Sequence, residues 1–445
     1  MKYYNSFSTL DELVQYLRNE ELTIPVSQNP EETLRRMVTI GDESTLRNSI
    51  AIQPMEGCDA TSDGAPGELT LRRYGKFAAS GAGLIWIEAT AVLEEARANP
   101  HQLFITEKNV DQFAALAEEI KTTAYREFGW APKIILQATH SGRFSKPYGE
   151  PKPIISYQNP ILSRNIQGKT EHIITDDELK SVEEAMGRTA ALAQRAGFDG
   201  MDIKSCHCYL FSEILSAYDR PGEYGGSFEN RTRLLRNSIR AACSRTNGNF
   251  LVTTRLNVYD GFAYPFGFGA AKDHDGADLS EAKRLVHELY EKEGISLVNI
   301  TIGTPYVNPH VNRPANYQTG GVDENPFVGV SRMLGCIREI KSACPEVKIV
   351  GSGLSYPGRF AGNVAAGALE AGYFDIAGFG RMAFANADFP KQMLNGTIVP
   401  NHCCIACGKC TELMRMGSGT GCVVRDPIYT KLYQEVASRQ KRQAI

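Results

Sequence analysis

The sequence lacks three features that would indicate a macromolecular or dinucleotide partner. Its 445 residues contain no apolar stretch long enough to span a bilayer, no polybasic run, and no Gly-x-Gly-x-x-Gly fingerprint after a predicted strand. The formal net charge of -3 leaves no basic stripe that could follow a phosphate backbone. These absences argue against a membrane protein, a nucleic-acid-binding protein and a separate dinucleotide-binding domain.

The N-terminal segment also lacks the apolar core of a secretion signal. Residues 1–30 are polar, and their pattern predicts an amphipathic helix around Leu10–Leu22. With 42% hydrophobic and 22% charged residues, the chain has enough apolar material for a large core. We therefore expect a cytoplasmic globular protein that acts on a small molecule. The sequence leaves open whether it forms a homo-oligomer.

Eleven cysteines are distributed unevenly along the chain. In a reducing compartment, cysteines more often serve as metal ligands, catalytic groups or buried thiols than as disulfides. Six are scattered, whereas five crowd into one short segment, namely Cys403, Cys404, Cys407, Cys410 and Cys422. That segment is a candidate metal centre.

Eight short apolar runs alternate with longer segments of helical periodicity, which is typical of repeated βα units. The predicted strands are Ser49–Pro54, Leu84–Ala89, Lys133–Ala138, Gly200–Lys204, Leu251–Leu256, Leu297–Thr301, Lys348–Ser352 and Asp375–Gly380. The predicted helices are Leu71–Ser80, Val110–Tyr125, Asp177–Ala196, Phe228–Arg245, Leu279–Glu293, Val328–Ala343, Arg359–Ala371 and Asp388–Leu394. Thr175 and Glu178 form a plausible capping box before one of them.

Eight alternations over roughly 350 residues favour an α/β protein with a (β/α)8 TIM barrel over a doubly wound sheet. The barrel is expected to span residues 48–400. Residues 1–47 would form an N-terminal extension and residues 401–445 a cysteine-rich tail.

In such a barrel the active site lies at the C-terminal ends of the strands. Gly353 follows the seventh predicted strand, Gly380 ends the eighth, and Arg381 comes directly after it. Glycine amides and an arginine at these two strand ends are typical of a phosphate site, although tight turns alone would also explain the glycines. Gln137 and Arg255 lie near the ends of two other predicted strands, and would fit either a ligand site or a structural polar layer in which a carboxylate such as Glu88 balances the arginine.

Several stretches of sequence carry a family pattern in a fixed order. They are Gln53–Met55, Gly83–Ala89, Leu136–Arg143, His207–Leu210, Arg220–Arg231 and Gly378–Arg381. The run Tyr-Gly-Gly-Ser-x-Glu-Asn-Arg at residues 224–231 is the most specific of them. By these motifs the chain resembles the old yellow enzyme family of NADH:flavin oxidoreductases, and in particular its 2,4-dienoyl-CoA reductase-like branch, over roughly residues 35–425.

The resemblance implies FMN at the mouth of the barrel. By analogy, Gln137 would bind the pyrimidine side, and Arg255 would stabilise negative charge near N1. The remaining implied FMN contacts are Pro54, Met55, Glu56 and Ala89 along the flavin, and Gly353, Gly380 and Arg381 at its phosphate.

The same resemblance implies that Tyr209 protonates the substrate carbon after hydride transfer. Lys204 and His207 stand where many relatives carry a His pair, or His and Asn, that holds the substrate carbonyl. Alternatively, Lys204 pairs with Asp202 or Glu88, and His207 is a core residue. Glu56 departs from the Thr or Cys that relatives often have beside the flavin.

The cysteine-rich tail has the spacing Cys404-x2-Cys407-x2-Cys410 with Cys422 eleven intervening residues later. Four thiolates at such spacing complete either a [4Fe-4S] cluster or a zinc site. The branch that the chain resembles carries an iron–sulfur cluster here, which favours the cluster over structural zinc or unliganded thiols. Cys403 would be an alternative first ligand.

The expected function is that of an ene-reductase, in which FMN reduces an activated alkene conjugated to a carbonyl or carboxyl group. About 25 residues follow Cys422, too few for a further flavin domain, so electrons are expected from NAD(P)H or from an electron-transfer protein through the cluster. Two alternatives remain: an oxidative amine dehydrogenase or demethylase of the same fold, and a flavin-free barrel lyase or hydrolase with a structural zinc tail.

Overall fold

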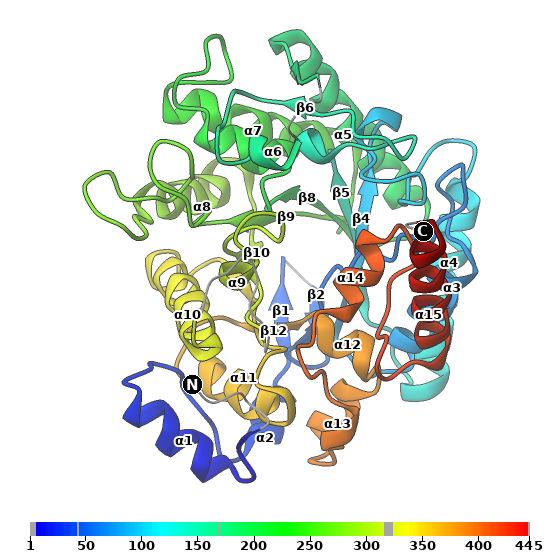
Figure 1. Cartoon of the computed structure of the whole chain (residues 1–445), viewed down its shortest axis with the longest axis vertical. Helices are drawn as coiled ribbons and strands as arrows, with labels where there is room; N and C mark the ends of the chain where they lie inside the picture. The colour runs from blue at the N-terminus through cyan, green and yellow to red at the C-terminus, as the bar shows by residue number, and fades with distance from the viewer. Residues whose placement is uncertain (1–5, 42–43, 167–169, 316–323, 444–445) are drawn as a thin grey trace.

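Eight parallel strands form a closed barrel in the computed structural model, which describes residues 6–41, 44–166, 170–315 and 324–443. The strands lie at the centre, and the helices surround them (Figure 1). Ala377 pairs with Ile50, so the last strand closes on the first. The barrel strands are β3 (Ile50–Ile52), β4 (Leu84–Ala91), β5 (Lys133–Thr139), β8 (Gly200–Ser205), β9 (Leu251–Asn257), β10 (Leu297–Thr301), β11 (Lys348–Gly351) and β12 (Ile376–Phe379). The predicted (β/α)8 barrel is confirmed.

Helices follow the barrel strands in the predicted alternation. They are α3 (Glu68–Ala78), α4 (Val110–Phe128), α5 (Asp176–Arg195), α6 (Leu210–Glu213), α7 (Phe228–Arg245), α8 (Ser280–Glu293), α9 (Pro309–Asn312), α10 (Pro326–Ala343), α11 (Ala361–Glu370), α12 (Arg381–Ala385) and α13 (Phe389–Leu394). The capping box of α5 is confirmed, because Glu178 N donates to Thr175 Oγ1 at 3.2 Å and Thr175 N donates back to Glu178 Oε2 at 2.7 Å. None of the helices within the described ranges is long and apolar enough to cross a membrane.

Predicted boundaries differ from the observed ones by at most three residues, and the largest differences are at the start of α3 and the end of α4. The predicted strand Ser49–Pro54 contracts to Ile50–Ile52, although Gln53 N still donates to Phe379 O at 3.0 Å. The side chain of Gln53 points into the barrel interior, where its amide nitrogen donates to Asn299 Oδ1 at 3.1 Å. The residues after Ile52 are therefore free to form the loop that enters the candidate site.

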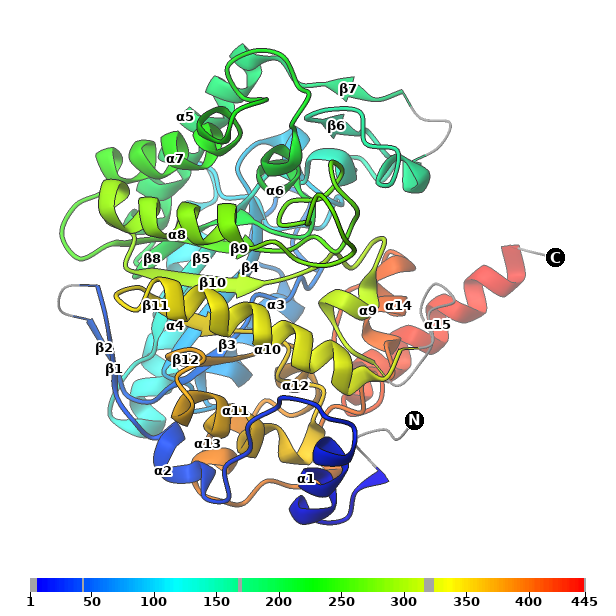
Figure 2. The ribbon, with the colours of Figure 1, turned by 90° about the vertical axis from the view of Figure 1, so that its left-hand side faces the viewer.

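The N-terminal segment packs on the outside of the barrel, and its hairpin lies at the amino-terminal end of the strands (Figure 2). It contains α1 (Leu10–Asn19), α2 (Pro30–Leu34) and an antiparallel hairpin of β1 (Val38–Ile40) and β2 (Ser44–Leu46). Ile40 and Leu46 of the hairpin pack against Trp86 and Ile135 in a buried apolar cluster. Burying these side chains removes apolar surface from water at this end of the barrel core.

The C-terminal segment lies against the open end of the barrel. It contains α14 (Lys409–Arg415) and α15 (Pro427–Gln443), which Figure 2 shows beside α9 and α12. Asp426 accepts from Arg72 of α3 at 2.8 Å, and Thr420 N donates to Gly57 O at 2.6 Å. Contacts from the cysteine-rich tail therefore complete the wall of the barrel mouth.

Two small strands, β6 (Ile154–Ile155) and β7 (His172–Ile173), form a separate parallel pair.

Candidate active site

A cavity of about 200 Å³ opens at the carboxyl ends of the barrel strands. Eleven of the twelve residues predicted for the flavin and the catalytic groups line it: Pro54, Met55, Glu56, Gln137, Lys204, His207, Tyr209, Arg255, Gly353, Gly380 and Arg381. Ala89 does not line it, because the carbonyl of Ala89 accepts a hydrogen bond from Gln102 Nε2 at 3.1 Å within the wall of β4. Residues separated by as many as 327 positions, from Pro54 to Arg381, thus meet in one site.

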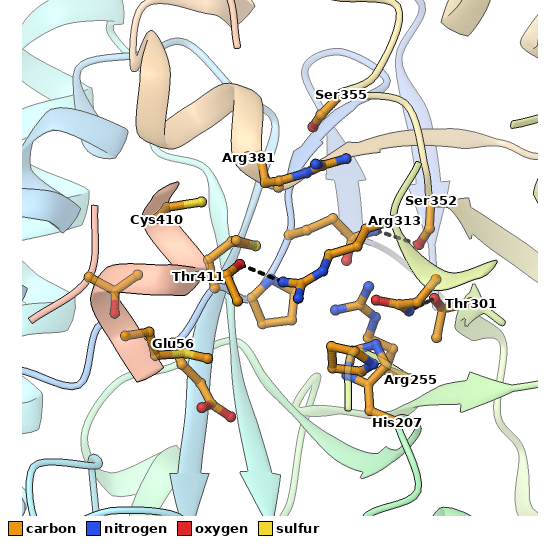
Figure 3. A pocket seen from close by; sticks show the side chains of 18 of the residues that line it. Glu56, His207, Arg255, Thr301, Arg313, Ser352, Ser355, Arg381, Cys410 and Thr411 are labelled. Atoms are coloured by element: carbon orange, nitrogen blue, oxygen red, sulfur yellow. Dashed lines mark hydrogen bonds between the residues drawn. The ribbon is translucent and has the colours of Figure 1, made fainter. Parts of the chain in front are cut away.

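The lining is strongly cationic. It contains one lysine and four arginines, namely Lys204, Arg255, Arg313, Arg381 and Arg415, whereas Glu56 is the one carboxylate among the described lining residues. The guanidinium groups of Arg255, Arg313 and Arg381 succeed one another across the cavity (Figure 3). Such a surplus of positive charge inside a partly desolvated cavity favours an anionic ligand or the development of negative charge.

One end of the cavity has the features of a phosphate cradle. Gly353 has a φ of +84°, and a side chain at Gly380 would collide with Met55 at 2.8 Å from Sδ. Arg381 donates through Nη2 to Pro314 O at 2.7 Å, while its buried Nη1 has no hydrogen-bond partner within the described residues. A charged donor that is buried without an acceptor is costly unless a ligand supplies one. This end therefore fits a phosphate group.

The other end of the cavity is built on a buried polar layer inside the barrel. Asp202 accepts from Gln137 Nε2 at 2.6 Å, from Trp86 Nε1 at 2.9 Å and from the backbone N of Arg255. Burial raises the pKa of Asp202 to about 6, and these donors act in the opposite direction. Because Asp202 engages the amide nitrogen of Gln137, the amide oxygen is left to accept from a ligand. The side-chain Nε of Arg255 is buried without a partner in the described structure.

Four side chains form a hydrogen-bonded group beside this end. Glu56 Oε1 lies 3.2 Å from Lys204 Nζ and accepts from the Tyr209 hydroxyl at 3.2 Å. The hydroxyls of Tyr209 and Tyr306 lie 2.8 Å apart, and Lys204 Nζ lies 3.7 Å from the centre of the Tyr209 ring. Lys204 is thus paired with Glu56, not with Asp202 or Glu88, and Glu88 instead pairs with Arg73 at 2.5 Å.

His207 reaches the cavity through an unusual backbone turn after β8. His207 and Cys208 both have left-handed backbone angles, with φ of +65° and +56°. Such angles cost free energy for residues other than glycine and persist where the surrounding structure fixes them, often at functional sites. Burial and the nearby Arg255 and Lys204 lower the pKa of His207 well below its usual range. The imidazole is therefore neutral, and its Nε2 has no partner within the described residues.

The four predicted metal ligands lie together next to this cavity. Cys404, Cys407, Cys410 and Cys422 line a small apolar pocket that shares Arg381, Phe384 and Cys410 with the main cavity. Cys403 is fully buried, and its thiol lies 3.5 Å from Val399 O instead of in this pocket. Burial raises the pKa of the Cys404 thiol to about 12. In the described part of the chain no three His, Cys, Asp or Glu side chains are arranged to hold a single metal ion.

Two groups of lining residues were not predicted from the sequence. Tyr306 and Arg313 follow β10, the one predicted strand whose end was assigned no role, so the rule used for the other strands would have found this segment. Thr411 and Arg415 come from α14 of the tail, and Arg313 donates to Thr411 Oγ1 at 2.6 Å (Figure 3). No sequence pattern indicated that the tail would reach the barrel mouth.

Comparisons with known proteins agree with this architecture. The model of the NADH:flavin oxidoreductase / NADH oxidase family matches residues 36–333. The NADPH dehydrogenase of Bacillus licheniformis is 30% identical over 285 residues, which are 63% of this chain and 76% of that enzyme. A complex of 2-naphthoyl-CoA reductase with 2-naphthoyl-CoA superposes with a TM-score of 0.74 at 19% identity, covering 91% of this chain but 58% of that one. Morphinone reductase superposes with a TM-score of 0.61 at 21% identity, covering 84% of this chain and 91% of that one.

Proposed function

The chain belongs to the NADH:flavin oxidoreductase / NADH oxidase family, a flavin-dependent oxidoreductase family, and from this membership we propose that it is an FMN-dependent ene-reductase. The observation that carries the proposal is the buried Tyr209 phenol in the lining of the cationic cavity. A proton donor next to groups that stabilise negative charge suits the reduction of an alkene conjugated to a carbonyl or carboxyl group.

The residues present fit FMN, because the cradle at Gly353, Gly380 and Arg381 accepts a phosphate and Gln137 and Arg255 offer polar groups at the opposite end. When bound, FMN supplies the hydride for the alkene. Arg255 would offset negative charge on the cofactor, as cations near a flavin do.

The chain's own residues would complete the reaction at the substrate. The neutral His207 and the Lys204 ammonium would hold the substrate oxygen and stabilise the charge that develops there. Tyr209 would donate its hydroxyl proton to the α-carbon. Glu56 would hold Lys204 and Tyr209 in place through its two 3.2 Å contacts.

An anaerobic half-reaction separates this function from its alternatives. Photoreduced protein mixed with 2-cyclohexen-1-one or cinnamate should return to the oxidised flavin spectrum and yield the saturated product. Oxidised protein that is instead reduced by trimethylamine, and that transfers nothing to either alkene, would replace the proposal with an oxidative amine dehydrogenase. Colourless protein that takes up no FMN would leave a flavin-free barrel enzyme.

Replacing Arg381 should weaken FMN binding. Arg381→Ala removes one charge-assisted contact to the phosphate, worth about 1.5–3 kcal/mol, so the Kd should rise roughly 10- to 150-fold. Quenching of FMN fluorescence on titration with apoprotein measures it. Arg359→Ala, which removes an arginine outside the cavity lining, should leave the Kd unchanged, and equal Kd values for both variants would contradict the phosphate assignment.

We further propose that the tail carries a [4Fe-4S] cluster on Cys404, Cys407, Cys410 and Cys422, as in the 2,4-dienoyl-CoA reductase-like branch. The convergence of these four thiols on one pocket supports the proposal. Cys410 also lines the main cavity, which would place the cluster close enough to exchange electrons with FMN.

Anaerobically purified protein should contain about four iron and four acid-labile sulfide per chain. Cys407→Ser should lose most of both, because a four-cysteine site would be left with three thiolates. Cys243→Ser, which replaces an exposed cysteine outside the tail, should retain them. Stoichiometric zinc without iron would reject the cluster in favour of a structural zinc site.

The source of the electrons is part of the same proposal. Either NAD(P)H reduces the flavin directly, or an electron-transfer protein delivers electrons through the cluster. Anaerobic mixing with NADH and with NADPH, followed at the flavin absorbance, decides between the two. Rapid reduction by one nucleotide would establish the direct route, whereas no reduction by either would favour a protein donor.

A further inference from the structure

Tyr306 is positioned by two contacts of different kinds. Its ring stacks on Phe144, with centroids 3.7 Å apart and planes inclined by 11°. Its hydroxyl lies 2.8 Å from the hydroxyl of Tyr209. The stacking fixes the ring and therefore the direction in which the hydroxyl points.

The number of hydrogens in this group fixes the direction of the bond between the two tyrosines. Tyr209 has a single hydroxyl hydrogen, which it donates to Glu56 Oε1 at 3.2 Å. The Glu56 carboxylate, paired with the Lys204 ammonium, only accepts. The remaining hydrogen bond, between the two phenols, must therefore be donated by Tyr306 to the oxygen of Tyr209.

Proton transfer from Tyr209 to a substrate would leave a phenolate in a poor environment for charge. Tyr209 is 2% exposed, and burial together with the Glu56 carboxylate raises its pKa well above its usual range. Tyr306 is partly exposed and lies after β10 on the cavity wall. The phenolate therefore needs rapid reprotonation, and the partly exposed Tyr306 is within hydrogen-bond distance of it.

We propose that Tyr306 is the proton relay of this site, which returns a proton to Tyr209 after each turnover. The inference rests on the proposed ene-reductase function. One proton leaves the Tyr209 oxygen for the substrate α-carbon, one moves from the Tyr306 oxygen to the Tyr209 oxygen, and one enters Tyr306 from water. No residue of the group is oxidised or reduced, and one solvent proton is consumed in each cycle.

The test follows flavin and solvent protons separately in a single turnover. Photoreduced protein is mixed anaerobically with 2-cyclohexen-1-one in weak buffer that contains a pH indicator. In the wild type, proton uptake should keep pace with flavin reoxidation. In Tyr306→Phe, reoxidation should stay within about threefold of the wild type, because Tyr209 begins protonated, whereas uptake should lag by tenfold or more, in line with a positioned proton-transfer group.

Two further measurements separate a relay from a structural role. Imidazole buffer should restore the lost uptake rate in Tyr306→Phe by delivering protons directly. Tyr218→Phe, which removes the hydroxyl of a partly buried tyrosine outside the cavity lining, should keep uptake and reoxidation coupled. In FMN-loaded protein at rest, the ζ-carbon resonance of Tyr209 in tyrosine-labelled material should shift in Tyr306→Phe, because its oxygen loses a donated hydrogen bond.

Each result that contradicts these expectations would have a different consequence. Uptake that keeps pace with reoxidation in Tyr306→Phe, or an unshifted Tyr209 resonance, would overturn the relay alone. Equal slowing of reoxidation and uptake would assign Tyr306 to substrate binding instead. Wild-type protein that is not reoxidised by either 2-cyclohexen-1-one or cinnamate would overturn the relay together with the ene-reductase proposal.

Discussion

Tyr209→Phe should slow the alkene-dependent reoxidation of the reduced flavin by roughly 10²–10⁴-fold, the usual contribution of a positioned acid. The substitution keeps the ring and deletes only the hydroxyl. The ring should remain in place because it packs 5.8 Å from the ring of Phe144 and beneath Lys204. Flavin reduction by the electron donor should continue at close to the wild-type rate, because that step needs no proton from Tyr209.

Stopped-flow measurement of the two half-reactions tests this prediction. Tyr218→Phe is a matched control, since Tyr218 is a partly buried tyrosine that does not line the cavity. Both half-reactions of the control should match the wild type. If Tyr209→Phe is reoxidised as fast as the wild type, Tyr209 is not the acid, and another proton donor must be sought in the cavity.

Arg73→Met should lower the free energy of unfolding by about 3–5 kcal/mol, which is the usual cost of removing one partner of a buried ion pair. Arg73 Nη1 lies 2.6 Å from Asp59 Oδ2, and Nη2 lies 2.5 Å from Glu88 Oε1. The three side chains are at most 5% exposed, so neither carboxylate would find water after the substitution. Burial already raises the pKa of Glu88 to about 7, although Arg73 favours its ionised form.

The neighbouring Arg72 provides the control. Its ion pair with Asp426 is more exposed, at 28% and 10% of the two side chains, and Lys76 remains as a second partner of Asp426 at 3.1 Å. Arg72→Met should therefore cost only about 0.2–1 kcal/mol, the range of exposed pairs. Urea unfolding of FMN-saturated protein measures both variants, and adding Glu88→Gln to Arg73→Met should recover part of the loss. Equal costs for the two arginines would contradict the buried network.

The buried ion pairs of Arg73 with Asp59 and Glu88 also connect the stability of the fold to the candidate active site. Glu88 accepts a hydrogen bond from the backbone N of Gly57, next to Glu56. Gly57 in turn accepts through its carbonyl from Thr420 of the tail at 2.6 Å. The loop that carries Glu56 is therefore held from both sides, and we expect Arg73→Met to disturb the position of Glu56 as well as the fold.

The barrel and most residues of its site could be predicted from the sequence, because the barrel follows from local hydrophobic periodicity and the site follows from the position of residues at strand ends. Alternating apolar runs and helical segments specify the βα units, and parallel strands bring their carboxyl ends to one face. Gln137 and Arg255 lie near the carboxyl ends of β5 and β9, and Arg381 follows β12, so the three line one cavity although they lie far apart in the sequence. Ala89 is the exception, because its carbonyl is used within the barrel wall by Gln102.

The partners of these residues were decided by the tertiary structure alone. Asp202 and Glu88 were the partners considered for Lys204 from the sequence, but the loop after β3 brings Glu56, 148 positions away, to its ammonium group. Tyr209 meets Tyr306 across 97 positions, and α14 of the tail meets Arg313 across 98. Sequence periodicity determines which face of an element is buried, but such pairings depend on where separate loops cross, and this is settled only when the whole barrel closes and the tail packs on its mouth.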